Sequence, residues 1–66
     1  MSQTVHEVAQ TQGWGDRYLV SDEDGNDVNR QVLVREVINV GTSRVICETA
    51  NGLRIEIQRL HEWKMS

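Results

Sequence analysis

The stretch RVICETANGLRIEIQ, residues 44–58, decides the fold, because two runs of alternating apolar residues flank Asn51-Gly52. Alternation with a period of two is typical of a strand that buries one face, and Asn-Gly is a strong signal for a tight hairpin turn. The stretch therefore predicts a β-hairpin.

Two registers of this hairpin compete. A two-residue loop would pair Glu48 with Ile55 and place a carboxylate among apolar neighbours, whereas a loop of residues 50–52, with its glycine left-handed, pairs Thr49 with Leu53. A slip of one residue moves every side chain to the opposite face, so the apolar pattern selects the three-residue loop. One face then carries Val45, Cys47, Thr49, Leu53, Ile55 and Ile57, while the other pairs Glu48 with Arg54, Ile46 with Glu56 and Arg44 with Gln58.

Residues 31–40, QVLVREVINV, fit a strand better than a helix. A helix would align Leu33, Val37 and Val40, but five of the ten residues are β-branched and lose side-chain freedom in a helix. In a strand only Glu36 interrupts the alternation, and a β-bulge near Arg35-Glu36 would explain this interruption. The predicted core face of this strand consists of Val32, Val34, Ile38 and Val40, so that Leu33, Val37 and the hairpin residue Ile46 fall off the core face.

The N-terminal segment has the pattern of a short helix. Thr4-Val5-His6-Glu7 fits a capping box, and Gly13 would end the helix. A helix of about two turns is not stable alone in water, so it would have to pack Val5 and Val8 on the rest of the domain. A tail and a strand are the alternatives for residues 1–12.

The other segments predict one more strand, a loop and a turn. Residues 17–20 have strand character, residues 21–26 form an acidic loop with a turn at Asp24-Gly25, and residues 60–63 suggest a single turn before a last short strand. The chain is thus expected to be a single small β domain, residues 1–66, with a barrel over residues 14–66 and a tail or short helix over residues 1–13.

A chain of 66 residues has little stability to spare. Cys47 is its only cysteine, and together with two histidines it cannot complete a four-ligand zinc site, so self-association is the remaining way to add stability. We expect no metal and no cofactor, and a homodimer is one expected state. No apolar run suits a signal peptide or a membrane span, and a single cysteine fits a reducing compartment, so the expected location is cytoplasmic.

Charge is distributed unevenly along the chain, whose formal net charge is −3. Residues 1–29 carry six acidic residues and one arginine, whereas residues 30–66 carry six basic and four acidic residues. The run Asp22 to Asp27 is not an EF-hand loop, because with Gly25 at the sixth position Val20 and Gln31 would stand at the first and twelfth, where carboxylates are required.

The order of strand, acidic loop, three meandering strands and short turn resembles an SH3-like small β-barrel of the Tudor or KOW type. Gly15-Asp16 would open the first strand, Glu23-Asp24-Gly25 would lie in the loop after it, and the Asn51-Gly52 hairpin would provide the third and fourth strands. The resemblance implies a barrel fold. It does not imply a methylated-residue cage, because Val20-Ser21 and Thr49-Ala50 stand where aromatic rings would be needed.

No arrangement of His, Ser or Cys suggests catalysis, so we expect no enzyme activity. We predict a protein-interaction module instead, of the kind found among small acidic phage and mobile-element accessory or inhibitor proteins. Trp14 is expected to be exposed and Trp63 to fill an end of the barrel. The candidate contact residues are Trp14, Leu33, Arg35, Val37, Arg44, Ile46, Arg54 and Arg59.

Two other functions compete with this prediction. One is a KOW-like nucleic-acid binder, and the negative net charge counts against it. The other is an acidic mimic of nucleic acid that uses the carboxylates of residues 1–29. The nucleic-acid binder would use Arg30, Arg35, Arg44, Arg54 and Arg59.

Overall fold

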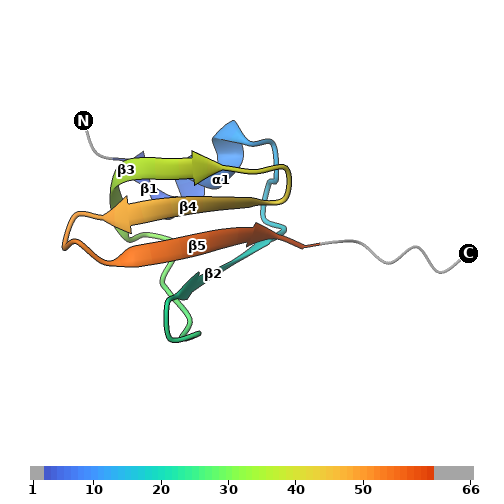
Figure 1. The fold of residues 1–66 in the computed structure, drawn as a ribbon. Helices are drawn as coiled ribbons and strands as arrows, with labels where there is room; N and C mark the ends of the chain where they lie inside the picture. The colour runs from blue at the N-terminus through green and yellow to red at the C-terminus, as the bar shows by residue number, and fades with distance from the viewer. Residues whose placement is uncertain (1–2, 61–66) are drawn as a thin grey trace, which may run out of the picture.

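The computed structural model describes residues 3–60 and consists of one antiparallel sheet and one helix. The sheet has the strand order β1-β3-β4-β5-β2 and curls into a half-barrel, with α1 behind β3 and β4 in the view of Figure 1. The prediction of a mainly β domain with a short N-terminal helix is confirmed. The elements are β1 (Gln3–Thr4), α1 (Val5–Thr11), β2 (Tyr18–Asp22), β3 (Leu33–Val40), β4 (Arg44–Thr49) and β5 (Arg54–Arg59).

The β4–β5 hairpin has the predicted three-residue loop. Glu48 pairs with Arg54, and the Thr49 N–H donates to the Leu53 carbonyl at 2.8 Å. Gly52 is left-handed, with φ of 85°. The predicted core face of the hairpin buries Val45, Cys47, Thr49, Ile55 and Ile57. Leu53, which was predicted on the same face, lies at the hairpin tip and is 59% exposed.

Strand β3 contains the predicted bulge and a second one that was not predicted. The pairing with β4 shifts between Val34 and Glu36 and again between Val37 and Asn39. At each shift two residues of β3 oppose one residue of β4, so the inward positions recur every third residue instead of every second. Val34 and Val37 therefore face inward, and the residues at the bulges face outward.

The structure corrects the expectation for three residues of β3. Val37 is half-buried against the core, although it was expected outside it. Ile38 is 44% exposed because the bulge turns it outward, and Val40, opposite Val45, is 55% exposed at the end of the strand. Leu33 lies off the core face as expected and is 47% exposed.

Helix α1 begins with the predicted capping box. The Thr4 hydroxyl accepts from the Glu7 N–H at 3.1 Å, and the Glu7 carboxylate accepts from the Thr4 N–H at 2.8 Å. Val5, Val8 and Ala9 are buried in the core, so this short helix is stabilised by packing on the concave side of the sheet. The helix alternative for the N-terminal segment is correct, with the two-residue strand β1 before it.

Trp14 belongs to the core, which corrects the expectation that it is exposed. Gly13, with φ of 81°, reverses the chain after α1, and the Trp14 N–H then donates to the Ala9 carbonyl at 3.2 Å. The indole is only 9% exposed and fills the core beside the helix. The expected last strand and the expected role of Trp63 lie outside the described residues. In the part of the chain that the structure describes, no helix is long and apolar enough to span a membrane.

Candidate functional site

The outer face is the side of the β3–β4–β5 sheet that points away from the core. Strand pairing places its side chains in three rows, with Ile46 in the middle row opposite Asn39 on β3 and Glu56 on β5. Because of the second bulge of β3, Ile38 and Asn39 together lie opposite Ile46, so the Ile38 side chain is next to that of Ile46. The outer face consists of Arg35, Glu36, Ile38, Asn39, Arg44, Ile46, Glu48, Arg54, Glu56 and Gln58.

Two ion pairs flank Ile46 on this face. Arg35 donates to Glu48, and Arg44 donates to Glu56 at 3.1 Å. The Arg44 side chain is 66% exposed and that of Glu56 26%. Ion pairs this open to solvent contribute about 0–1 kcal/mol to stability, so either arginine can exchange its carboxylate for another partner at little cost.

Four of the eight predicted contact residues lie together on the outer face: Arg35, Arg44, Ile46 and Arg54. Leu33 is exposed at the start of β3, beside the β4–β5 loop, where its carbonyl accepts from the Ala50 N–H at 3.0 Å. Trp14 and Val37 are part of the core or packed against it, and Arg59 pairs with Tyr18 at the end of β5. Ile38 is the apolar outer-face residue that the sequence interpretation missed, because nothing in the sequence marks its bulge.

A shallow groove of about 190 Å³ connects the outer face to the acidic turn after β2. Its apolar part is Ile46 with Ile55, and its rim carries Arg54 and three carboxylates, those of Asp22, Glu23 and Glu56. This volume lies below the roughly 300–1,000 Å³ of small-molecule sites, so the groove suits a single side chain of a partner rather than a cofactor.

Asp22 holds the acidic turn together. Its Oδ1 accepts from the backbone N–H groups of Asp24 and Asn26, both at 2.9 Å. The Asn26 N–H, which favours the charged form, is the main reason that the pKa of Asp22 lies below its usual value. This carboxylate therefore serves the turn itself.

The arginines of the nucleic-acid hypothesis do not share one surface. Arg30 lies over the Tyr18 ring, 4.1 Å from its centroid, and donates to the carbonyls of Asp16 at 3.2 Å and Tyr18 at 3.0 Å. Arg35 and Arg44 are paired with glutamates on the outer face. The carboxylates of the mimic hypothesis are also dispersed, since Glu7 caps α1 and Asp16 precedes β2 while the others lie in the turn after β2.

Tyr18 and Cys47, two side chains with potentially reactive groups, are buried in the core. Tyr18 is fully buried, its hydroxyl lies 2.6 Å from His6 Nδ1, and burial raises its pKa while Arg30 opposes the rise. Burial also raises the pKa of the Cys47 thiol to about 11, so it is protonated at neutral pH. Among residues 3–60, no cluster of His, Cys, Asp and Glu is placed to hold a metal ion. His61 lies outside these residues.

Comparison with known proteins gives no relative for this chain. No family model matches the sequence, and no curated protein or solved structure matches it significantly. The resemblance to Tudor and KOW barrels stays a prediction.

Proposed function

We propose that this chain is a non-enzymatic protein-interaction module that binds its partner on the outer face of the sheet. The observation that carries the proposal is the pair of isoleucines, Ile38 and Ile46, brought together by the second bulge of β3 in the middle of a charged strand face. Ile38 is 44% exposed and Ile46 is half-buried. This apolar surface does not stabilise the domain while it is exposed to water. Its burial under a partner would stabilise the complex.

The charges around the isoleucines favour a protein over a nucleic acid. Three arginines and three glutamates surround them, so the outer face is neutral although the chain carries a net charge of −3. A neutral mosaic of both signs suits the mixed rim of a protein interface, whereas phosphate backbones require an excess of positive charge. A second copy of the chain is the simplest partner, because a two-fold axis lets one patch serve both sides.

The test is Ile46→Asp, with Leu53→Asp at the β4–β5 hairpin tip as the matched control. Leu53 is 59% exposed and lies opposite the buried Thr49, on the other side of the sheet from the isoleucines. Burying an isoleucine contributes about 1.5–3 kcal/mol, so Ile46→Asp should weaken binding at least tenfold. The control should change binding by less than about threefold.

Sedimentation equilibrium over a range of protein concentrations measures self-association directly. If the chain is monomeric, a partner isolated with and without nuclease treatment is titrated by calorimetry against both variants. Added salt should weaken binding only slightly, whereas a phosphate-binding protein would lose affinity steeply. Equal affinities of wild type and Ile46→Asp, with circular dichroism showing both to be folded, would exclude the outer face as the interface.

A further inference from the structure

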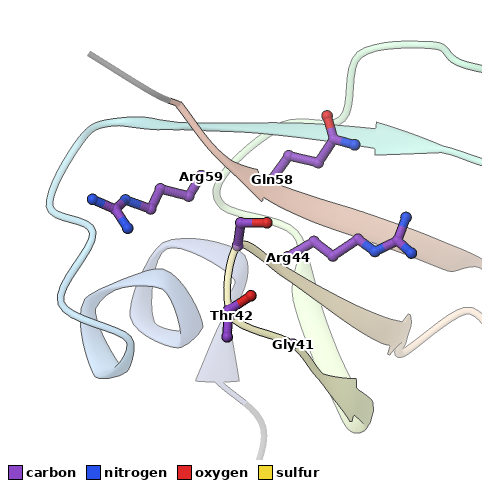
Figure 2. A pocket seen from close by; sticks show the side chains of 6 residues that line it. Gly41, Thr42, Arg44, Gln58 and Arg59 are labelled. Atoms are coloured by element: carbon purple, nitrogen blue, oxygen red, sulfur yellow. The ribbon is translucent and has the colours of Figure 1, made fainter. Parts of the chain in front are cut away.

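The turn between β3 and β4 forms one wall of a second hollow, which we call the turn pocket (Figure 2). Its volume is about 530 Å³. Apart from Gly41, every lining residue has a side chain that can donate hydrogen bonds; two of these side chains are cations, and none is a carboxylate. The turn pocket is lined by Gly41, Thr42, Ser43, Arg44, Gln58 and Arg59.

Backbone hydrogen bonds fix this turn from both sides. The Gly41 N–H donates to the Arg44 carbonyl and the Arg59 N–H donates to the Ser43 carbonyl, both at 2.8 Å. A Cβ on Gly41 would lie 3.2 Å from the Arg44 carbonyl oxygen, so the close approach at this position favours glycine. The turn is therefore held in place by β5 as well as by its own strands.

The fixed turn leaves several donors available. Within the described residues, the backbone N–H groups of Thr42 and Ser43 donate to no carbonyl, and their hydroxyls have no hydrogen-bond partner. Unpaired N–H and O–H groups in one turn can bind an anion, because the anion accepts hydrogen bonds from them.

Figure 2 shows Arg44 and Arg59 on opposite sides of the turn, with their side chains extending away from each other. Arg44 lies opposite Gln58 on the outer face, and Arg59 lies opposite the buried Tyr18. Arg59 makes no ion pair among residues 3–60, and Arg44 is held at its present position by Glu56 at 3.1 Å. Both side chains are long and exposed, so both guanidinium groups can swing toward the turn. Glu56 thus competes with any anion for Arg44.

We propose that the turn pocket binds a phosphate monoester or free phosphate, with Arg44 leaving Glu56 to join Arg59 on the phosphate oxygens. Two guanidinium groups balance the charge of close to −2 that such a group carries at neutral pH. The planar fork of each arginine can donate two hydrogen bonds to a phosphate, and the Thr42–Ser43 turn supplies further donors. This site does not depend on the outer-face proposal, because its ligand needs no partner protein.

The experiment titrates the full chain with inorganic phosphate at low salt and follows the amide and arginine side-chain signals by NMR. Saturable shifts are expected at Thr42, Ser43, Arg44 and Arg59. Arg44→Gln and Arg59→Gln should each weaken binding at least threefold. Arg54→Gln, which removes an equal charge outside the pocket, should leave the affinity within about 1.5-fold, and a loss as large as with the pocket variants would overturn the site.

A second pair of variants tests the exchange of partners by Arg44. Glu56→Gln should tighten phosphate binding at least twofold because it frees Arg44, whereas Glu48→Gln, which frees only Arg35, should not. Equal effects of these two variants would contradict the proposed role of Arg44.

Two further ligands identify the class of phosphate. Phenyl phosphate should bind as well as inorganic phosphate, and dimethyl phosphate, a diester with a single charge, should bind at least threefold more weakly. Equal binding of the diester would overturn the monoester assignment and point to a phosphodiester backbone or a phospholipid.

Discussion

At the scale of single residues, two left-handed glycines determine where neighbouring side chains go. Gly52, with φ of 85°, closes the β4–β5 loop and keeps Glu48 opposite Arg54. Gly13, with φ of 81°, reverses the chain after α1 and directs Trp14 into the core. Positive φ is accessible to glycine without a steric penalty. At each position the backbone conformation of one glycine therefore determines where side chains of other residues lie.

Replacing Gly52 with valine should destabilise the domain by about 1–3 kcal/mol, because a β-branched residue is strained at positive φ. A Cβ at this position meets no atom within 4 Å, so the penalty is purely conformational. Gly52→Asn is the control and should lose less stability than Gly52→Val, since asparagine tolerates the left-handed region. Urea denaturation of the three proteins measures the differences. Similar stabilities of the valine and asparagine variants would show that the loop does not require the left-handed conformation.

The sequence predicted the roles of both glycines, Gly52 in the hairpin loop and Gly13 at the end of the helix, but not the burial of Trp14. Gly52 lies between two alternating runs, and only one register keeps both runs apolar on the same face, so its role followed from its neighbours. Trp14 lies between two glycines with no periodic pattern beside it, and its burial depends on where α1 packs. Contacts of that kind are made by segments distant in sequence, which local patterns do not encode.

At the scale of elements, the two bulges of β3 decide both the core and the candidate site. The first bulge was predictable because Glu36 interrupts an apolar alternation. The second lies in Val37–Ile38–Asn39, where an apolar residue can face either side, so the pattern gave no sign of it. This bulge places Ile38 beside Ile46, which means that half of the central apolar pair of the outer face was invisible to sequence reasoning.

The acidic turn after β2 should make stability depend on pH at the acid end. The pKa of Asp22 is lowered in the folded state, chiefly by the Asn26 N–H, so the charged form stabilises folding above the unfolded-state pKa of about 4. This contribution should be lost as pH falls through the lower folded-state pKa. In thermal melts across this pH range, the melting temperature should fall less for Asp22→Asn than for wild type as pH is lowered. Asp24→Asn, which leaves the Asp22 side-chain hydrogen bonds in place, should behave like wild type, and matching curves for all three proteins would contradict the assignment.

At the scale of the whole molecule, each side of the sheet has its own role. The concave side, with α1 and Trp14, contains the core, whereas the convex side carries the neutral outer face. One end of the sheet carries the acidic turn and the other the turn pocket with its two arginines. The sequence showed that charge was uneven along the chain, but which charges share a surface follows from strand order, and strand order is set by pairings across the whole chain.

One polar network joins three segments of the molecule and should contribute measurably to its stability. The Tyr18 hydroxyl on β2 lies 2.6 Å from His6 Nδ1 on α1, and Arg30, from the segment before β3, covers the Tyr18 ring. Tyr18→Phe keeps the ring and removes this hydrogen bond, so it should reduce the free energy of unfolding at neutral pH by about 0.5–1.5 kcal/mol. Urea denaturation measures the loss, and a variant as stable as wild type would show that the hydroxyl does not stabilise the fold.

The same hydroxyl should also set an alkaline limit to stability. Burial raises the pKa of Tyr18, so folding favours the protonated phenol; its contribution is complete below the unfolded-state pKa of about 10 and is lost as pH rises through the higher folded-state value. Tyr18 is the only tyrosine, so phenolate absorbance follows this group alone. The measurement belongs in a Cys47→Ala background, because the buried thiol, with its pKa of about 11, would add a similar alkaline loss. Phenolate appearing at the pH of a free tyrosine while the protein is still folded would contradict the buried network.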